Sequence, residues 1–211
     1  MSFSHSSISS YETCPLKYKL TRIDRLEEPS GTAAERGTLI HAEFEEAIKG
    51  LTLVDTTRTW WVEYLEQLKS KNAQPEVRIG LTKDWQPCDF FSEEVHLRGV
   101  FDVIYFEDTW AHVLDWKTGK ERDYTEQLKL YAAMIFAYYP WITRVSKEIC
   151  YIDHDRRVSQ GVTERDEFES LKAWVDGRID RIGNDKVYAP KPTYLCKWCH
   201  FRKDNGGPCI W

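Results

Sequence analysis

Charged residues in two apolar segments near the middle of the chain could hold a divalent cation and act on a phosphate. Asp102 lies in Val100–Ile104 (VFDVI), and Asp115 and Lys117 lie in 110–117 (WAHVLDWK). Residues two apart point to the same side of an extended strand, so Asp115 and Lys117 should share a face. Carboxylate oxygens suit Mg²⁺ or Mn²⁺, and a nearby lysine can orient or deprotonate a water or offset charge on a phosphate.

An Asp-x-Lys sequence also occurs in ordinary surface ion pairs, and these side chains would then belong to a solvated hairpin. The neighbours Val113 and Leu114 indicate a buried strand instead. A charge there is costly unless it is paired or bound to a metal. We therefore favour a catalytic role for Asp102, Asp115 and Lys117.

The six cysteines are distributed unevenly. Three of them crowd the last sixteen residues, namely Cys196, Cys199 and Cys209, whereas the others are Cys14, Cys88 and Cys150. Such crowding in a reducing compartment indicates metal or cluster ligation. Three thiolates need a fourth partner, either for a tetrahedral zinc site or for a cubane cluster. That partner could be Cys14 or His200, although His200 directly follows Cys199 and joint chelation would be awkward. Cys88 and Cys150 are interpreted as ordinary apolar positions.

Hydrophobic periodicity predicts the elements that must position these residues. Helices are expected over 6–20, 32–49, from Thr57 onward, 124–139 and 163–182, and strands over 76–81, 93–106, 110–117 and 144–152. This order indicates one mixed α/β domain over 1–211. Its Pro-, Gly- and Cys-rich tail over 186–211 shows no period.

Composition limits the class of protein. With 211 residues, 42% hydrophobic and 14% aromatic, the chain can bury a core, which excludes a disordered protein, a collagen-like repeat and a small disulfide scaffold. A net charge of −5 disfavours a protein that merely coats nucleic acid, but it suits an enzyme whose carboxylates hold metal. No signal peptide or membrane span is evident, so we expect a soluble cytoplasmic protein without a membrane partner.

Four short motifs resemble, in order and spacing, those of RecB-like nucleases in the PD-(D/E)XK superfamily. They are Gly37-x-x-x-His41, Gly99-x-x-Asp102, Asp115-x-Lys117 and Gln127-x-x-x-Tyr131. The resemblance extends over about residues 6 to 211. It implies a mixed central sheet flanked by helices, the restriction-endonuclease-like core.

The resemblance also implies roles for individual residues. His41, Asp102 and Asp115 would ligate the metal together with the backbone carbonyl of Trp116, and Lys117 would be the catalytic lysine. Gln127 and Tyr131 share one helical face and would position DNA or the lysine. Glu76 could be a further catalytic carboxylate, as related enzymes often carry a glutamate on an early strand, but an exposed strand-end glutamate fits equally well. Periodicity alone leaves a purely structural histidine open at position 41.

The segment Tyr11–Tyr18 (YETCPLKY) resembles the Cys-Pro-x-Lys-Tyr stretch of the iron–sulfur branch, which includes the AddB nuclease domain and CRISPR-adaptation nucleases. The resemblance implies a 4Fe–4S cluster on Cys14, Cys196, Cys199 and Cys209, which would clasp the tail to the N-terminal helix. The interval before Cys209 is longer than the family usually shows. Zn²⁺ at the same sulfurs, or a separate zinc site that uses His200, remains an alternative.

The resemblance implies a Mg²⁺- or Mn²⁺-dependent DNA nuclease, an exonuclease that hydrolyses phosphodiester bonds in recombination, repair or phage and mobile-element DNA processing. Its substrate would be DNA ends or single strands, with a recombination or helicase protein as partner, in a bacterial host cell if the gene is phage-borne. The alternative is a catalytically inactive DNA-binding or adaptor protein with a nuclease-like fold and a structural metal site. The intact Asp115-x-Lys117 pair argues against it.

An acidic nuclease needs a local basic path to approach phosphates. The candidate DNA-binding residues are Lys17, Tyr18, Lys197 and Arg202. The aromatic residues Tyr18, Trp198 and Phe201 could stack on unpaired bases. A solvated basic face above core aromatics would give the same sequence pattern.

Overall fold

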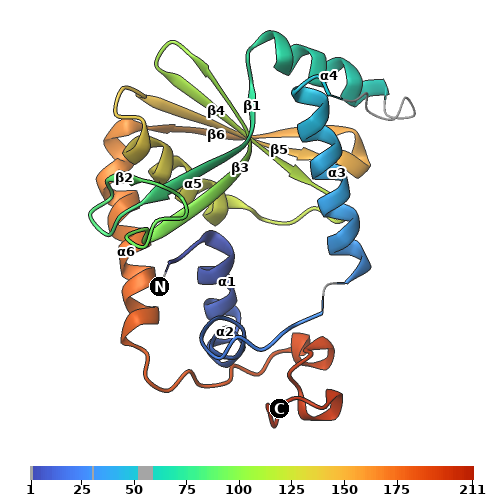
Figure 1. Cartoon of the computed structure of the whole chain (residues 1–211), viewed down its shortest axis with the longest axis vertical. Helices are drawn as coiled ribbons and strands as arrows, with labels where there is room; N and C mark the ends of the chain where they lie inside the picture. Colours follow the sequence, from blue (N-terminus) through green and yellow to red (C-terminus); the bar gives the residue numbers. More distant parts are fainter. Residues whose placement is uncertain (1, 30, 52–58) are drawn as a thin grey trace. The chain divides into compact units, whose positions relative to one another are not determined.

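The computed structural model describes residues 2–29, 31–51 and 59–211 (Figure 1). The chain forms two compact units, one of Thr32–Lys172 with Ser2, and one of Phe3–Gly31 with Ala173–Trp211. The expectation of a single nuclease domain stays a prediction. In the described part of the chain, no helix combines the length and the hydrophobicity needed to span a membrane.

A six-stranded mixed sheet forms the centre of the first unit, in the order β2-β1-β3-β4-β5-β6. Its strands are β1 (Gln74–Leu81), β2 (Pro87–Cys88), β3 (Leu97–Glu107), β4 (Trp110–Lys117), β5 (Arg144–Tyr151) and β6 (Arg156–Glu164). β4 and β5 are parallel, and the other neighbours are antiparallel. Helix α5 (Thr125–Tyr138) connects the parallel pair, as a parallel connection requires. The predicted mixed α/β class is confirmed.

Alternation along β4 assigns the helices to the two faces of the sheet. Leu114 and Trp116 are buried in an apolar cluster with α3 (Thr32–Ile48) and α4 (Thr59–Ser70). Asp115, between them, accepts a hydrogen bond from α5. Because neighbouring residues of a strand point to opposite faces, α3 and α4 cover one face and α5 covers the other.

The sheet forks between β3 and β4. Their ladder ends at Val103↔Leu114, whereas β3 continues beside β1 and β4 continues beside β5. Beyond this point the Asp102 Oδ2 atom accepts a hydrogen bond from the Trp116 N–H at 2.7 Å. A side chain thus replaces the next strand-to-strand bond, and a carboxylate lies in the fork.

Two predicted helices differ from the structure. The helix expected over 163–182 begins only at Phe168, as α6 (Phe168–Asn184), and Thr163 belongs to β6. The sequence of β6, RRVSQGVTE, carries little apolar signal because this edge strand is mostly exposed. The helix expected over 6–20 breaks at Cys14, which is extended (φ −160°, ψ 108°) because a residue before proline avoids the helical region.

The second unit contains both the first helices and the tail. Its elements are α1 (His5–Thr13), α2 (Pro15–Tyr18), the π-helical turn η1 (Lys19–Ile23), the later part of α6, η5 (Tyr194–Trp198) and η6 (Lys203–Asn205). The Tyr11 hydroxyl donates to Asp185 Oδ2 at 2.8 Å, and Lys191 Nζ donates to the Glu12 carbonyl at 2.7 Å. The Lys191 bond attaches the tail to α1, whereas the clasp through the four cysteines stays a prediction. The helix expected from Thr57 is α4, and Thr57 itself lies outside the described residues.

Candidate active site and cysteine-lined cavity

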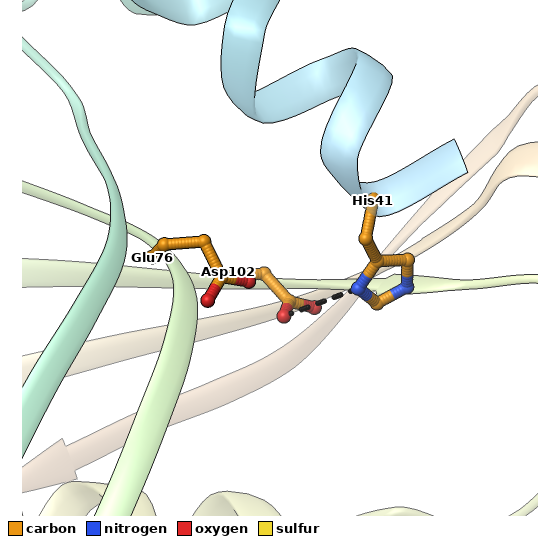
Figure 2. A group of neighbouring side chains, drawn as sticks. All are labelled: His41, Glu76 and Asp102. Atoms are coloured by element: carbon orange, nitrogen blue, oxygen red, sulfur yellow. Dashed lines mark ion pairs between the residues drawn. The ribbon is translucent and has the colours of Figure 1, made fainter. Parts of the chain in front are cut away.

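Three side chains that could hold a metal meet at the fork (Figure 2). His41 comes from α3, Glu76 from β1 and Asp102 from β3, and one ligand atom of each lies within 4.8 Å of the other two. His41 Nδ1 is 3.4 Å from Asp102 Oδ1. All three residues are half-buried. Two carboxylates and an imidazole form a donor set that fits Mn²⁺, and fits Mg²⁺ through the carboxylates.

Glu76 reaches this group through an unusual backbone conformation. Its φ is +50°, in the left-handed region, although it lies within a strand. The flanking pairs Pro75↔Val103 and Val77↔Phe101 place it opposite Asp102. Left-handed backbone at a residue other than glycine costs about 1–2 kcal/mol and is concentrated at functional sites. The strain is consistent with a constraint on where the Glu76 carboxylate must lie.

Replacing Glu76 by glycine is expected to separate this strain from metal binding. The free energy of unfolding should stay unchanged or rise by up to about 1 kcal/mol, because glycine adopts φ +50° without steric cost. Affinity for Mn²⁺ should fall at least about tenfold with the loss of a ligand. Urea unfolding and Mn²⁺ titration measure the two effects. In the control Glu76→Ala, Mn²⁺ affinity should fall equally but stability should be lower than in the glycine variant; the reverse order of stability would contradict the strain.

Two carboxyl groups at the fork, those of Glu76 and Asp115, have a raised pKa. Burial and the charge of Asp102 raise the pKa of Glu76. The same two causes raise the pKa of Asp115 to about 6, against the opposing effect of Lys117. Burial opposes protonation of His41, but the contact with Asp102 outweighs it and raises the pKa of His41. The fork therefore has an excess of negative charge that a divalent cation would neutralise.

Two side chains outside the group of three potential ligands, Gln127 and Lys117, hold the Asp115 carboxylate. It is 2% exposed, its Oδ1 accepts from Gln127 Nε2 at 2.8 Å, and its Oδ2 forms an ion pair with Lys117. The Gln127 amide also donates to the Tyr131 hydroxyl at 3.1 Å, and this hydroxyl donates to the Val100 carbonyl at 2.8 Å. Gln127 and Tyr131 thus fix Asp115 against β3. Tyr131 is buried, so it orients the carboxylate rather than contacting a large ligand.

The predicted site residues therefore converge, with one difference in grouping. Glu76, left open by the sequence, belongs to the group of three potential ligands, whereas Asp115 does not. The Trp116 side chain packs in the core, with its ring 5.1 Å from that of Phe44. Its N–H faces Asp102 in the fork. Because the N–H and C=O of one strand residue face the same neighbour, its carbonyl faces the fork too.

A contact that sequence reasoning missed ties α3 to the loop after β4. Asp153, in the turn η3 (Ile152–His154), accepts from Arg36 Nη1 at 2.9 Å and from the Gly119 N–H at 2.7 Å. A Cβ atom on Gly37 would lie 3.2 Å from Thr118 Oγ1, so α3 passes close to the same loop. Gly37 of the first motif is the sequence signal that could have indicated this approach.

We expect Asp153→Asn to lower the free energy of unfolding by about 1 kcal/mol at pH 7. The effect is small because Arg36 is half-exposed and solvent screens its charge. The hydrogen bond from Arg36 lowers the pKa of Asp153 to about 2. A depressed pKa gives stability that is present above about pH 4 and is lost as pH falls toward 2. Urea unfolding at pH 7 and pH 3 should show the deficit shrinking in acid. The control Asp155→Asn, in the same turn, should be neutral; a deficit independent of pH would contradict the ion pair.

Four of the six free cysteines line one cavity in the second unit. Its volume is about 260 Å³, and its walls include Cys14, Cys196, Cys199 and Cys209. Sulfurs around one tetrahedral zinc ion lie about 3.8 Å apart, given a Zn–S bond of about 2.3 Å. Among the residues that the structure describes, no three of these sulfurs lie within 4.8 Å of one another. The Thr193 N–H donates to Cys196 Sγ at 3.3 Å, the kind of bond that stabilises a thiolate.

The residues predicted to contact DNA differ in accessibility. Lys197 lies 3.8 Å above the ring of Trp198, which is 65% exposed. Lys17 and Arg202 are ion-paired with acidic neighbours. Tyr18 is 1% exposed and stacks on Tyr188 within the second unit, so its predicted stacking on a base is wrong, and Phe201 is buried as well. Aromatic residues near lysines do not reveal in sequence which of them reach the surface.

The model of the PD-(D/E)XK nuclease superfamily matches residues 2–203. The chain belongs to this superfamily. The crystal structure of a "Putative exonuclease" from Eubacterium rectale superposes with a TM-score of 0.55 and 14% identity, over 94% of this chain and 87% of that one. A crystal structure of the protein SSO0001 gives a TM-score of 0.48 and 16% identity, over 95% and 83%. No curated protein matches the sequence. PD-(D/E)XK nucleases use divalent metals, and the fork holds a group of residues suited to one.

Proposed function

We propose that this chain is a Mg²⁺- or Mn²⁺-dependent deoxyribonuclease that removes nucleotides from DNA ends. The observation that carries the proposal is the fork, where the potential ligands His41, Glu76 and Asp102 lie next to the Asp115–Lys117 ion pair. Family membership supports phosphodiester hydrolysis, and the name of the Eubacterium rectale neighbour supports action on ends. DNA recombination, repair or mobile-element DNA processing is the proposed setting.

The proposed ligands are His41, Glu76 and Asp102, with Asp115 and the Trp116 carbonyl completing the set. When bound, a divalent cation would neutralise phosphate charge and lower the pKa of a water. In the described part of the chain, two carboxylates and an imidazole share a small half-buried volume, which suits a cation of this kind.

Lys117 is the proposed catalytic lysine. It lies mostly buried beside Asp115, with its ammonium 4.6 Å from the centre of the Tyr124 ring. Burial opposes its charge, but Asp115 outweighs burial and raises the pKa of Lys117. The ammonium is therefore charged and can hold the attacking water or stabilise the negative charge that grows on the phosphate. Water adds to phosphorus, the bond from phosphorus to the 3′ oxygen breaks, and the products carry a 5′-phosphate and a 3′-hydroxyl.

The four cysteines of the cavity are proposed to bind a 4Fe–4S cluster. A cubane with one cysteine per iron spreads its sulfurs more widely than a single ion does. The lining of one cavity by all four cysteines supports one ligand shared by their sulfurs. A brown protein with four irons per chain is the result expected of this assignment; a colourless protein with stoichiometric zinc would contradict it.

The nuclease proposal is tested on end-labelled linear and on closed circular DNA, single- and double-stranded, with Mg²⁺ or Mn²⁺. Linear DNA should shorten from its ends, closed circles should stay intact, and EDTA should stop the reaction. Cleavage of closed circles would overturn the action on ends. Binding of DNA without cleavage under any of these conditions would favour the inactive adaptor protein.

A further inference from the structure

The side chains of His41, Glu76 and Asp102 are called the metal group below. Beyond this group, β3 presents an arginine on the face of the sheet away from α5. The Phe101 ring lies 4.3 Å from the ring of Tyr131 in α5. A Cβ atom on Gly99 would lie 2.9 Å from Met134 of the same helix. Phe101 and Gly99 therefore face α5. Since strand residues alternate, Arg98 faces the other way.

Arg78 of β1 joins Arg98 on that face. The register pairs Arg78 with Val100 and Gly80 with Arg98, and paired residues of antiparallel strands point to the same side. Arg78 follows Glu76 by two residues, which is about 7 Å along the strand. Gly80, the residue of β1 that pairs with Arg98, follows Glu76 by about 13 Å. The two arginines thus form a line that leads away from the metal group.

Two phenylalanines lie over this line. A Cβ atom on Gly80 would lie 2.9 Å from the Cys88 carbonyl oxygen and 3.0 Å from Phe90 Cα, so the absence of a side chain lets this segment rest on β1. Arg98 Cζ is 5.4 Å from the centre of the Phe90 ring. Arg78 Cζ is 5.8 Å from the centre of the Phe91 ring. Phe91 is 69% exposed.

Neither arginine is held in an ion pair by a carboxylate of the described residues, although the charge of Arg78 acts on nearby Glu76. Within the described residues, the guanidiniums of Arg78 and Arg98 form no ion pair, and Arg98 Nε is buried without a hydrogen-bond partner. Other arginines of the first unit do form ion pairs, namely Arg36, Arg144, Arg156 and Arg157. Two unpaired guanidiniums next to an exposed ring offer hydrogen bonds to phosphate and a surface on which a base can stack.

We propose that Arg78, Arg98 and Phe91 form a subsite for an unpaired strand of DNA that continues away from the metal group. The guanidiniums bind consecutive phosphates and the Phe91 ring stacks on a base. The subsite rests on the proposed nuclease function, because the same strand would pass the fork where it is cut. It also favours a substrate whose end is single-stranded at the site.

The test measures binding of a fluorescent single-stranded oligonucleotide by anisotropy in EDTA, where no cleavage occurs. Arg78→Ala should raise Kd about tenfold at 0.1 M salt. It should also reduce the slope of log K against log salt by about 0.7, the value for one lost phosphate contact on a single strand. Arg78→Ala with Arg98→Ala should reduce the slope by about 1.4. Lys83→Ala, an exposed cation close to β1 in sequence, is the control and should change neither quantity.

Replacement of Phe91 should change the affinity for the oligonucleotide but not the salt dependence of that affinity. Phe91→Ala should raise Kd about tenfold without changing the salt slope, and Phe91→Tyr should restore binding, because stacking needs a ring and no charge. An unchanged Kd and slope in the double arginine variant would overturn the subsite. So would displacement of the oligonucleotide by a poly-glutamate peptide at equal concentration, which would indicate an acidic protein segment as ligand.

The two proposals fail separately in these measurements. A wild-type protein that binds the strand through Arg78 but cleaves no DNA with Mg²⁺ or Mn²⁺ would keep the subsite and overturn the nuclease. A wild-type protein that cleaves DNA and whose arginine variants bind the strand normally would keep the nuclease and overturn the subsite.

Discussion

Lys117→Met is expected to lower the rate of metal-dependent cleavage by about 10³-fold at saturating DNA. A positioned donor that stabilises charge in the transition state contributes about 10²–10³-fold, and a proton-transfer group contributes about 10²–10⁴-fold. Lys117 is the one described cation that is ion-paired with Asp115, so no other side chain takes over this contact. Rates are measured in single turnover with Mn²⁺, and Kd for DNA is measured separately. Loss of rate with unchanged Kd would assign the effect to chemistry.

Stability distinguishes a catalytic loss from a structural one. In Lys117→Met, Asp115 keeps the hydrogen bond from Gln127 but loses its charged partner while 2% exposed. An unpaired buried carboxylate should lower the free energy of unfolding by about 2 kcal/mol. The double variant Asp115→Asn with Lys117→Met removes both charges, so much of that stability should return while the enzyme stays inactive. Cleavage near the wild-type rate in either variant would overturn the assignment of Lys117.

The elements that carry the site were predictable because their signals are local. The apolar stretches around Asp102 and Asp115 predicted β3 and β4, and the return of helical periodicity after Tyr124 predicted α5. Two of these elements, β4 and α5, are joined by the hydrogen bond between Asp115 and Gln127. Strong hydrophobic periodicity determines which side of each element is buried, and hence which polar residues can meet.

Features that depend on the tertiary structure were not predictable. Nothing in the tripeptide Pro75–Val77 indicates a left-handed backbone at Glu76, because a glutamate adopts it only where surrounding contacts impose it. The fork likewise depends on one side-chain bond, from the Trp116 N–H to Asp102, that has no local sequence signature. β6 was missed because an exposed edge strand needs little apolar character.

The arginines of β1 and β3 illustrate a third case. Their alternation with buried residues is visible in the sequence, and it predicts that they face solvent. That they form no ion pair in the described part of the chain depends on where every acidic side chain lies. Patterns of charge therefore indicate a surface, and only the structure indicates which cations on it are available to a ligand.

If the four cysteines bind the proposed iron–sulfur cluster, Cys14→Ser should abolish its binding and destabilise the second unit by about 5 kcal/mol or more, because the binding energy of a structural metal centre is also folding energy. Cys14 lies at the break between α1 and α2, whereas the other three cysteines of the cavity belong to the tail. The proposed cluster would therefore cross-link segments about 180 residues apart in sequence, and closing so long a loop costs much entropy. Iron content and visible absorbance report the cluster, and limited proteolysis reports exposure of the tail.

The matched control is Cys88→Ser, which changes a half-exposed free cysteine of the first unit. It should keep full iron content and resistance to proteolysis. The Mn²⁺ affinity of Cys14→Ser should remain near that of the wild type, because His41, Glu76 and Asp102 belong to the other unit. Full iron content in Cys14→Ser would remove Cys14 from the ligand set. Loss of metal in His200→Ala would then assign the fourth position to that histidine, since it directly follows Cys199 in the same tail.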